Sequence, residues 1–201
     1  MHYKINYMRF ISFVLLSLIA SSCNIQTTSE QSEVETDSLK THDVVNSDST
    51  IKRDSITGDF NGDGKQETAW LVPPEIAVPG ESCVGECIST INFSDGSIQP
   101  IKIDQCIGGQ PINLGDLNDN VGDEIGLNPE WFTSCWSGYK VFTLKNNKPV
   151  DLVPPISVHC DHMEQGLTPI QKDKARKGYV IIKSSEMKDT GLVVNKISVK
   201  L

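Results

Sequence analysis

Two short acidic stretches with the same residue rhythm constrain this chain more than any other feature. The first, Asp59–Glu67, reads DFNGDGKQE, and the second, Asp116–Glu124, reads DLNDNVGDE. Each sets oxygen-bearing side chains at positions 1, 3, 5 and 9 among residues that favour tight turns. Such side chains repel one another or stay hydrated unless a cation lies among them. The chain therefore forms two sharp turns that concentrate negative charge.

Calcium is the cation that this arrangement favours, because Ca²⁺ takes hard oxygen ligands around a turn whereas Mg²⁺ demands a stricter octahedron. We expect Ca²⁺ at both turns, with the main-chain carbonyl of position 7 as a further ligand. The expected ligand sets are Asp59, Asn61, Asp63, Lys65 and Glu67, and Asp116, Asn118, Asn120, Gly122 and Glu124. The first set is expected to bind more tightly because it contains more carboxylates. The alternative is that both are Asx-rich turns without a metal.

The residues that follow the two turns exclude an EF-hand. That motif needs a bidentate glutamate at position 12 and flanking helices. Position 12 is Trp70 in the first turn and Leu127 in the second, and a β-branched or apolar run follows each turn. The calcium ligands therefore have to end at position 9.

Both loops resemble the calcium loops of FG-GAP/VCBS repeats, which form the blades of integrin α-type β-propellers and occur in many bacterial surface proteins. The resemblance is carried by GDFNGDGKQETAWLV (58–72) and GDLNDNVGDEIGL (115–127). The second has Asp119, Asn120 and Val121 where the family has glycine, aspartate and glycine. The resemblance implies calcium binding and blade-like strands, and it implies no reaction.

The rest of the domain reads as short strands. Residues Ile88–Ile103 alternate apolar and polar around a Ser-Asp-Gly-Ser turn, and Tyr139–Val153 does so around Asn-Asn-Lys. Residues 178–185 and 192–200 form another predicted pair. No stretch of 12 or more residues has a helical period. The fold class is therefore predicted to be all-β.

The spacing of the two loops limits the architecture. They are offset by 57 residues (116 − 59), and each is followed by a strand and a hairpin, which indicates an internal duplication. A propeller needs about 4–8 blades, and this chain is too short for four repeats of that length. We expect two or three propeller-blade-like antiparallel sheets in one open or sandwich-like monomeric domain, not a closed propeller. Association of copies through sheet edges is the alternative.

The N-terminus has the features of a bacterial lipoprotein signal peptide, predicted over residues 1–22. Lys4 and Arg9 are basic, and Phe10–Ala20 is an apolar run of 11 residues, shorter than the about 20 that span a bilayer. The small residues before Cys23 resemble a lipobox, in which the Cys23 thiol is acylated and becomes the mature N-terminus. Its acyl chains, such as palmitate, would anchor the protein to a membrane. An ordinary secretory signal is the alternative.

Residues 24–54 are rich in Ser, Thr, Asp and Glu and contain no Phe, Trp or Tyr, so they are predicted to be a disordered tether. Residues 55–201 then form the domain. Loss of Lys4 and Arg9 leaves 16 of 18 basic residues against 26 acidic ones, a net charge of −10. This charge argues against nucleic acid as a partner. We expect a lipid anchor in the outer membrane of a bacterial envelope, on its periplasmic or surface face.

Five cysteines follow Cys23, and export favours disulfides, while the odd count leaves one thiol over. Cys83 can pair with Cys87 across a glycine-bearing loop. Cys135 and Cys160 bracket the second hairpin and can join its base, which leaves Cys106 unpaired. A Cys87–Cys106 bridge at the open end of the first hairpin is the alternative.

These features predict a non-enzymatic calcium-binding envelope lipoprotein that binds or scaffolds an unknown protein or glycan. The sequence contains no nucleophile elbow, phosphate loop or metalloprotease motif. An enzyme or accessory subunit is the main alternative, and it requires His159, Asp161 and His162 to converge in a pocket. A mechanical spacer is a third. The aromatic cluster Trp131, Phe132 and Trp136 is expected to fill the core or to form a partly exposed platform for a glycan or peptide.

Overall fold

Each acidic loop connects the first two strands of an antiparallel sheet. The computed structural model describes residues 55–201, all of which belong to one compact unit. The predicted signal peptide, Cys23 and the tether lie outside the described residues. Among residues 55–201, no helix has the length and apolar character needed to cross a membrane.

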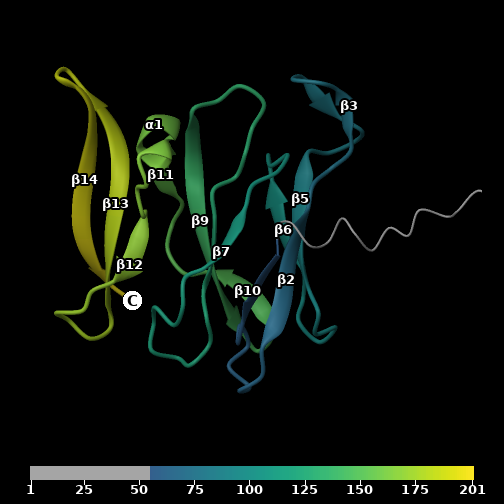
Figure 1. Cartoon of the computed structure of the whole chain (residues 1–201), viewed down its shortest axis with the longest axis vertical. Coiled ribbons are helices and arrows are strands. Elements are labelled where there is room, and N and C mark those ends of the chain that lie inside the picture. Colours follow the sequence, from purple (N-terminus) through teal and green to yellow (C-terminus); the bar gives the residue numbers. More distant parts are fainter. Residues whose placement is uncertain (1–54) are drawn as a thin grey trace, which may run out of the picture. The chain divides into compact units, whose positions relative to one another are not determined.

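The first sheet is a four-stranded antiparallel meander in the order β1-β2-β5-β6 (Figure 1). Its strands are β1 (Ser55–Gly58), β2 (Glu67–Val72), β5 (Ile88–Phe93) and β6 (Ile101–Asp104). A small hairpin of β3 (Ile76–Val78) and β4 (Ser82–Cys83) is inserted between β2 and β5. In β5 every second residue is buried, so the predicted alternation and the predicted β5–β6 hairpin are both confirmed.

The second sheet repeats this meander in the order β7-β8-β9-β10. Its strands are β7 (Pro111–Asn113), β8 (Ile125–Leu127), β9 (Trp136–Lys145) and β10 (Lys148–Asp151), and β11 (Ile156–His159) pairs with the first half of β9. The predicted β9–β10 hairpin is confirmed. Its turn residues Asn146 and Asn147 have φ of 53° and 60°, the backbone that a two-residue hairpin turn requires and that asparagine tolerates.

The third sheet is a meander of three strands, β12 (Ile170–Lys172), β13 (Tyr179–Lys188) and β14 (Gly191–Lys200). The predicted C-terminal hairpin is confirmed as β13–β14. A single helical turn, α1 (Cys160–Glu164), connects β11 to the segment before β12. It is the one α-helix within residues 55–201.

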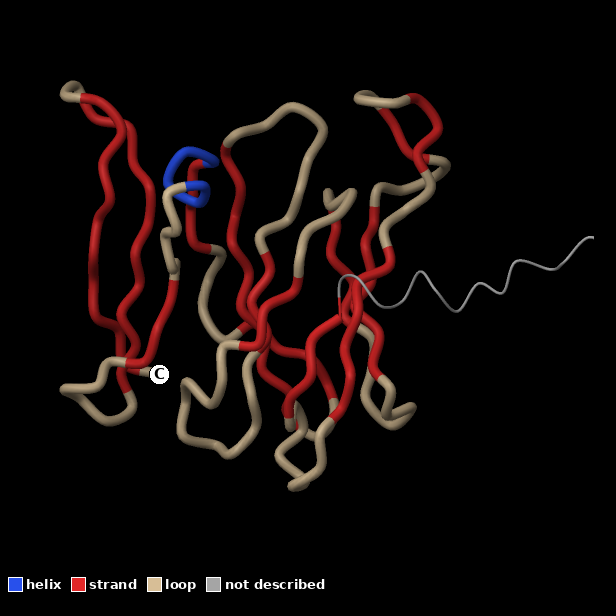
Figure 2. The backbone as a smooth tube through the Cα atoms, viewed as in Figure 1, coloured by secondary structure: helices blue, strands red, loops and turns tan. Residues whose placement is uncertain are grey.

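The three sheets stand side by side in an open row, and their apolar faces form two cores (Figure 2). The first core joins Ile91 of the first sheet to Ile125 and Leu127 of the second. The second core joins Tyr139 and Val141 to Val180 of the third sheet. Residues 55–201 close neither a barrel nor a propeller. The predicted fold class, all-β with two to three open blade-like sheets, is therefore confirmed.

Candidate functional site

Loop 1 (residues 59–67) is a turn whose acidic side chains accept hydrogen bonds from its own backbone. Asp59 accepts from the N–H of Asp63 at 3.0 Å and from that of Gly64 at 2.9 Å. Asn61 Oδ1 also accepts from Asp63 N–H at 3.0 Å, and Asp63 accepts from Lys65 N–H at 2.8 Å. Glu67, the first residue of β2, accepts from the N–H at position 2 at 2.9 Å. These bonds wrap the backbone around the side chains of positions 1, 3, 5 and 9.

Loop 2 (residues 116–124) repeats four of the five hydrogen bonds of loop 1 at the same positions. The side chains of positions 1 and 3 both accept from the N–H of position 5. The side chain of position 5 accepts from the N–H of position 7, and the side chain of position 9 accepts from the N–H of position 2. The corresponding pairs are Asp116–Asn120 (3.2 Å), Asn118–Asn120 (2.9 Å), Asn120–Gly122 (3.0 Å) and Glu124–Leu117 (2.5 Å). The two stretches therefore share one conformation as well as one sequence pattern.

The backbone of positions 4 and 6 is left-handed in both loops. In loop 1 these positions are Gly62 (φ 74°) and Gly64 (φ 86°). In loop 2 they are Asp119 (φ 64°) and Val121 (φ 83°). A β-branched residue in this region is strained, whereas glycine is not. Loop 2 therefore keeps the conformation of loop 1 at a cost in backbone energy.

The last acid of each loop is buried. Glu67 and Glu124 are both covered, and position 2 beside each is a buried apolar residue, Phe60 or Leu117. Burial raises the pKa of Glu124 to about 7, against the lowering effect of the Leu117 N–H. Burial also raises the pKa of Glu67, and the Asp59 and Asp63 carboxylates add to this. Each loop thus holds a carboxylate that a cation would stabilise in its charged form.

The carboxylates of loop 1 converge. Oxygen atoms of Asp59, Asp63 and Glu67 all lie within 4.8 Å of one another. Two oxygens bound to one Ca²⁺ at about 2.3–2.6 Å lie at most about 5 Å apart, so this donor set fits one ion. Asn61 directs its amide toward Asp95 at 3.5 Å, and Lys65 places its ammonium 3.7 Å from Asp63. The structure thus brings together the three carboxylates proposed for loop 1.

Protein groups already occupy the corresponding space around loop 2. The amide of Asn118 donates to Glu124 at 2.7 Å and contacts Thr143 Oγ1 at 3.3 Å. Lys172, at the end of β12, places its ammonium 2.6 Å from Asp119 and 2.8 Å from the Asp116 carbonyl. The bond to Asp119 raises the pKa of Lys172. A lysine from the third sheet therefore supplies positive charge at loop 2.

Loops 1 and 2 are also bonded to each other. The N–H of Asp59 donates to Asp123 Oδ2 at 3.3 Å, and its carbonyl accepts from Asp123 N–H at 2.8 Å. Asn113 of β7 donates from Nδ2 both to Asp123 Oδ2 and to the Thr57 carbonyl, each at 2.9 Å. Asp123 lies outside the 1-3-5-9 pattern, and its role is to join the first two sheets at this end of the molecule.

A third loop occupies the same place in the third sheet, and the sequence analysis missed it. Asp173 follows β12 directly, at an offset of 57 from Asp116 (173 − 116), and loop 3 (residues 173–178) leads into β13. Its carboxylate accepts from the Ala175 N–H at 3.0 Å, from Ser198 Oγ at 2.9 Å and from Arg176 Nη2 at 2.9 Å. In loop 3 a guanidinium therefore stands against the position-1 aspartate. A search for a third copy at the same offset would have found Asp173.

The cysteines pair as Cys83–Cys87 and Cys135–Cys160, and Cys106 is a buried free thiol. This is the first of the two connectivities that the sequence left open. The Cys106 N–H donates to the Cys87 carbonyl at 3.0 Å, so these residues are neighbours although they are not bridged. The Cys135–Cys160 bridge ties the start of β9 to α1.

His159 and His162 have different hydrogen-bond partners. His159 Nδ1 contacts the Asp161 N–H at 3.3 Å, and its ring packs edge-on against Trp136. His162 Nδ1 instead contacts Ser185 Oγ of β13 at 2.7 Å. The Ser185 side chain is buried. His159 Nδ1 also lies 3.7 Å from Asp161 Oδ2. The two imidazoles thus serve separate local contacts, and the enzyme alternative stays a prediction.

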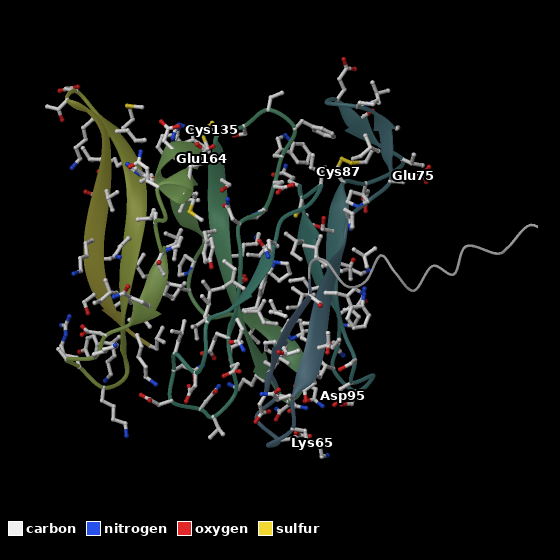
Figure 3. All side chains as sticks on the ribbon, in the orientation of Figure 1. Lys65, Glu75, Cys87, Asp95, Cys135 and Glu164 are labelled. Atoms are coloured by element: carbon white, nitrogen blue, oxygen red, sulfur yellow. A yellow bond between two sulfur atoms is a disulfide. The ribbon has the colours of Figure 1, made fainter. Side chains whose placement is uncertain are left out.

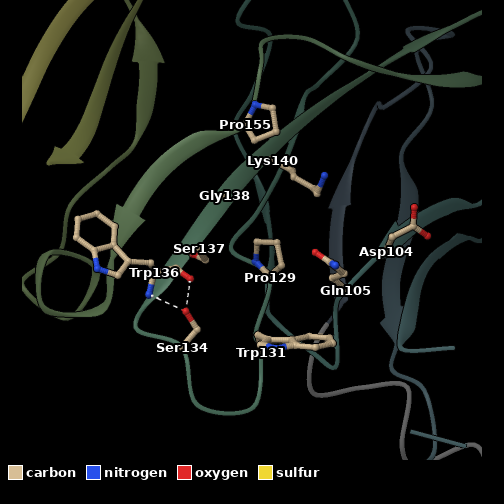
Figure 4. Close-up of a pocket in the computed structure, with 10 residues that line it drawn as sticks. All are labelled: Asp104, Gln105, Pro129, Trp131, Ser134, Trp136, Ser137, Gly138, Lys140 and Pro155. Atoms are coloured by element: carbon tan, nitrogen blue, oxygen red, sulfur yellow. Dashed lines mark hydrogen bonds between the residues drawn. The ribbon is translucent and has the colours of Figure 1, made fainter. Parts of the chain in front are cut away.

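The aromatic cluster lies at the other end of the molecule from loop 1. Figure 3 shows Cys87 and Cys135 at one end and Lys65 and Asp95 at the opposite end. Trp131 and Trp136 are each 39% exposed, so neither belongs to the core. Both line a cavity of about 390 Å³ (Figure 4). The sequence analysis named these aromatic residues but not Asp104, Gln105 and Lys140, which line the same cavity from other strands and turns.

Comparisons of the chain with protein-family models, with curated proteins and with solved structures gave no significant match.

Proposed function

We propose that this chain is a non-enzymatic, calcium-stabilised module of a bacterial envelope lipoprotein, which binds or scaffolds a partner. The observation that carries the proposal is the convergence of the Asp59, Asp63 and Glu67 carboxylates within 4.8 Å of one another in loop 1. Three like charges at this separation repel strongly unless a divalent cation neutralises them. A cation bound only by the folded chain would hold β1 against β2 and so stabilise the first sheet.

We assign both loops to the FG-GAP/VCBS type and expect a graded affinity for Ca²⁺. Support comes from the four matching side-chain-to-backbone bonds and the matching left-handed positions. Loop 1 is the stronger site, because three carboxylates converge there. Loop 2 is the weaker one, because Lys172 already lies 2.6 Å from Asp119 and a bound ion would be repelled by its ammonium.

Calorimetric titration tests the calcium proposal. The mature chain, residues 23–201 without the lipid, is stripped with chelator and titrated with CaCl₂, and its melting temperature is followed in parallel. We expect one tight site and a raised melting temperature. MgCl₂ serves as the matched ion and should have a smaller effect. Absence of heat and an unchanged melting curve at millimolar CaCl₂ would refute the proposal.

The lipid anchor is proposed from the sequence alone and needs its own test. Cells that express the full chain are fed an alkyne-labelled palmitate, and the labelled protein is compared with a Cys23→Ser variant. Label should appear in the wild type only, and the variant should leave the membrane fraction. Label that persists in Cys23→Ser, or a wild type without label, would contradict the anchor while leaving the calcium proposal untouched.

A further inference from the structure

A cavity of about 390 Å³ opens between the end of β6 and the face of β9, away from the acidic loops (Figure 4). Asp104 and Gln105 line it from the first sheet, and Lys140 lines it from the second. The loop between β8 and β9 contributes Pro129 and Trp131. The cavity therefore depends on the packing of two sheets and on the loop that the Cys135–Cys160 disulfide ties to α1.

Trp131 supplies an aromatic surface at one end of this cavity. Its indole is 39% exposed and packs edge-on against Phe132, with ring centroids 5.1 Å apart. Figure 4 shows the indole lying across one end of the cavity, beside Gln105 and Pro129. Trp131 also lines two adjoining cavities, one beside Cys87 and one beside Cys160. A fixed and partly exposed aromatic surface is thus available to a ligand over a broad area.

Two of the polar side chains that line the cavity are bonded within the protein: Ser134 Oγ donates to the Trp136 carbonyl, and Ser137 Oγ donates to Asn128. The other three are Asp104 and Gln105, which are exposed, and Lys140, which is half-buried, and within residues 55–201 none of the three has a side-chain hydrogen bond or ion pair. Together they offer a carboxylate acceptor, an amide that both donates and accepts, and an ammonium donor. One acid and one base give the cavity no net charge. Such a set suits a neutral ligand with many hydroxyl groups better than a phosphate or another polyanion.

Gln105 has a strained backbone at this site. Its φ is 52°, in the left-handed region that costs a residue with a side chain about 1–2 kcal/mol. Strain of this kind persists at ligand sites, where it positions a side chain. Glycine would relieve the strain but would remove the amide that Figure 4 shows beside Trp131.

We propose that this cavity binds a neutral saccharide. A pyranose ring has an apolar face of C–H groups that matches the indole of Trp131, and its rim of hydroxyl groups matches Asp104, Gln105 and Lys140. A ligand site of this type combines an apolar surface with a few placed polar groups. The inference names a ligand class for the binding module, at a site separate from the acidic loops, and it does not require calcium there.

Glycan-array screening followed by titration tests the proposal. The mature chain is applied to an array of neutral and acidic oligosaccharides. The protein is then titrated with the neutral oligosaccharide that binds best, once in the presence of CaCl₂ and once in the presence of chelator. We expect a neutral oligosaccharide to bind in both conditions, with at least a tenfold loss in Trp131→Ala. Binding of acidic glycans alone, or the absence of any glycan ligand, would overturn the proposal. Failure of calcium binding would leave this result unaffected.

A second variant separates a ligand role from a structural one. Gln105→Gly should raise the melting temperature, because it relieves strain, and weaken saccharide binding at least fivefold. The matched control is Val121→Gly, which relieves a left-handed residue in loop 2 and should raise the melting temperature with binding unchanged. Asp104→Asn should keep the fold and weaken binding. Unchanged binding in both Gln105→Gly and Asp104→Asn would overturn the assignment of this cavity.

Discussion

Asp59 and Asp123 exchange two hydrogen bonds: the Asp59 N–H donates to the Asp123 carboxylate, and the Asp59 carbonyl accepts from the Asp123 N–H. The bonds join a predicted metal ligand of loop 1 to a residue of loop 2 that the ligand pattern does not include. Lys172 makes the next link, from the third sheet to loop 2. One end of the molecule is thus held by a chain of polar contacts across all three sheets.

Asp123→Ala should destabilise the domain. The change leaves the Asp59 N–H and the Asn113 amide without their shared acceptor, and bonds to a half-buried carboxylate contribute about 1–2 kcal/mol. Urea denaturation of the chelated protein measures the loss. Asp189→Ala, at the exposed turn between β13 and β14, is the control and should be neutral. A neutral Asp123→Ala would mean that apolar packing alone joins the first two sheets.

Asp59→Ala should weaken calcium binding more than Asp116→Ala. Asp59 belongs to the convergent trio of carboxylates, whereas Asp116 lies in a loop whose charge Lys172 already offsets. At calcium concentrations about 100 times the dissociation constant, the bound ion adds about 2.7 kcal/mol to stability. Calorimetric titration with CaCl₂ and melting curves should show most of that gain lost in Asp59→Ala and retained in Asp116→Ala. The reverse order would show that loop 2 is the principal site.

Lys172→Met should increase the calcium affinity of loop 2. The substitution keeps a chain of similar length and removes the ammonium that lies 2.6 Å from Asp119. We expect a second binding event in the titration and a lower stability of the chelated protein, because Asp119 loses its partner. Lys174→Met, in loop 3, is the matched control and should change neither. The absence of a second binding event in Lys172→Met would show that the lysine orders loop 2 instead of competing with the ion.

Val121→Gly should stabilise the protein. Val121 is 68% exposed with a φ of 83°, so its side chain contributes little packing and its backbone is strained. Glycine removes the backbone strain of the folded state but gives the unfolded chain more conformational entropy. The net gain in the free energy of unfolding is about 0.5–1 kcal/mol. Thermal denaturation measures the gain. Val194→Gly is the control, because Val194 is also exposed but lies in β14, and this change should lower the melting temperature.

Asp173 should make stability depend on pH on the acid side. The N–H of Ala175, then Ser198 and Arg176, hold the pKa of Asp173 below its usual value. A carboxyl with a depressed folded-state pKa contributes stability above its unfolded pKa of about 3.9, and the contribution disappears as pH falls through the folded value. The stability difference between wild type and Asp173→Asn should therefore be constant near neutrality and shrink below pH of about 4. Urea denaturation over this range measures it, and a difference that persists in acid would contradict the assignment.

Much of the fold could be predicted because its signals are local. The alternation in Ile88–Ile103 shows which residues face the core, and the asparagines at 146 and 147 mark a two-residue turn. The third repeat was missed because loop 3 is shorter and keeps only Asp173 of the ligand pattern. Of the two roles expected for the aromatic cluster, core filling is wrong for Trp131, because its side chain is partly exposed beside a cavity between two sheets. Residue type alone does not decide exposure.

The acidic pattern, the turn residues, the strand period and the cysteines able to form disulfides can all be read from the amino-acid order, because each depends on groups close together in the chain. Which charges face one another depends on how the three sheets pack. Asp59 meets Asp123 across 64 positions, and Lys172 meets loop 2 from 56 positions away. Electrostatic energy depends on distance in space, so a cation site and the lysine that competes with it become distinguishable only after the sheets have packed.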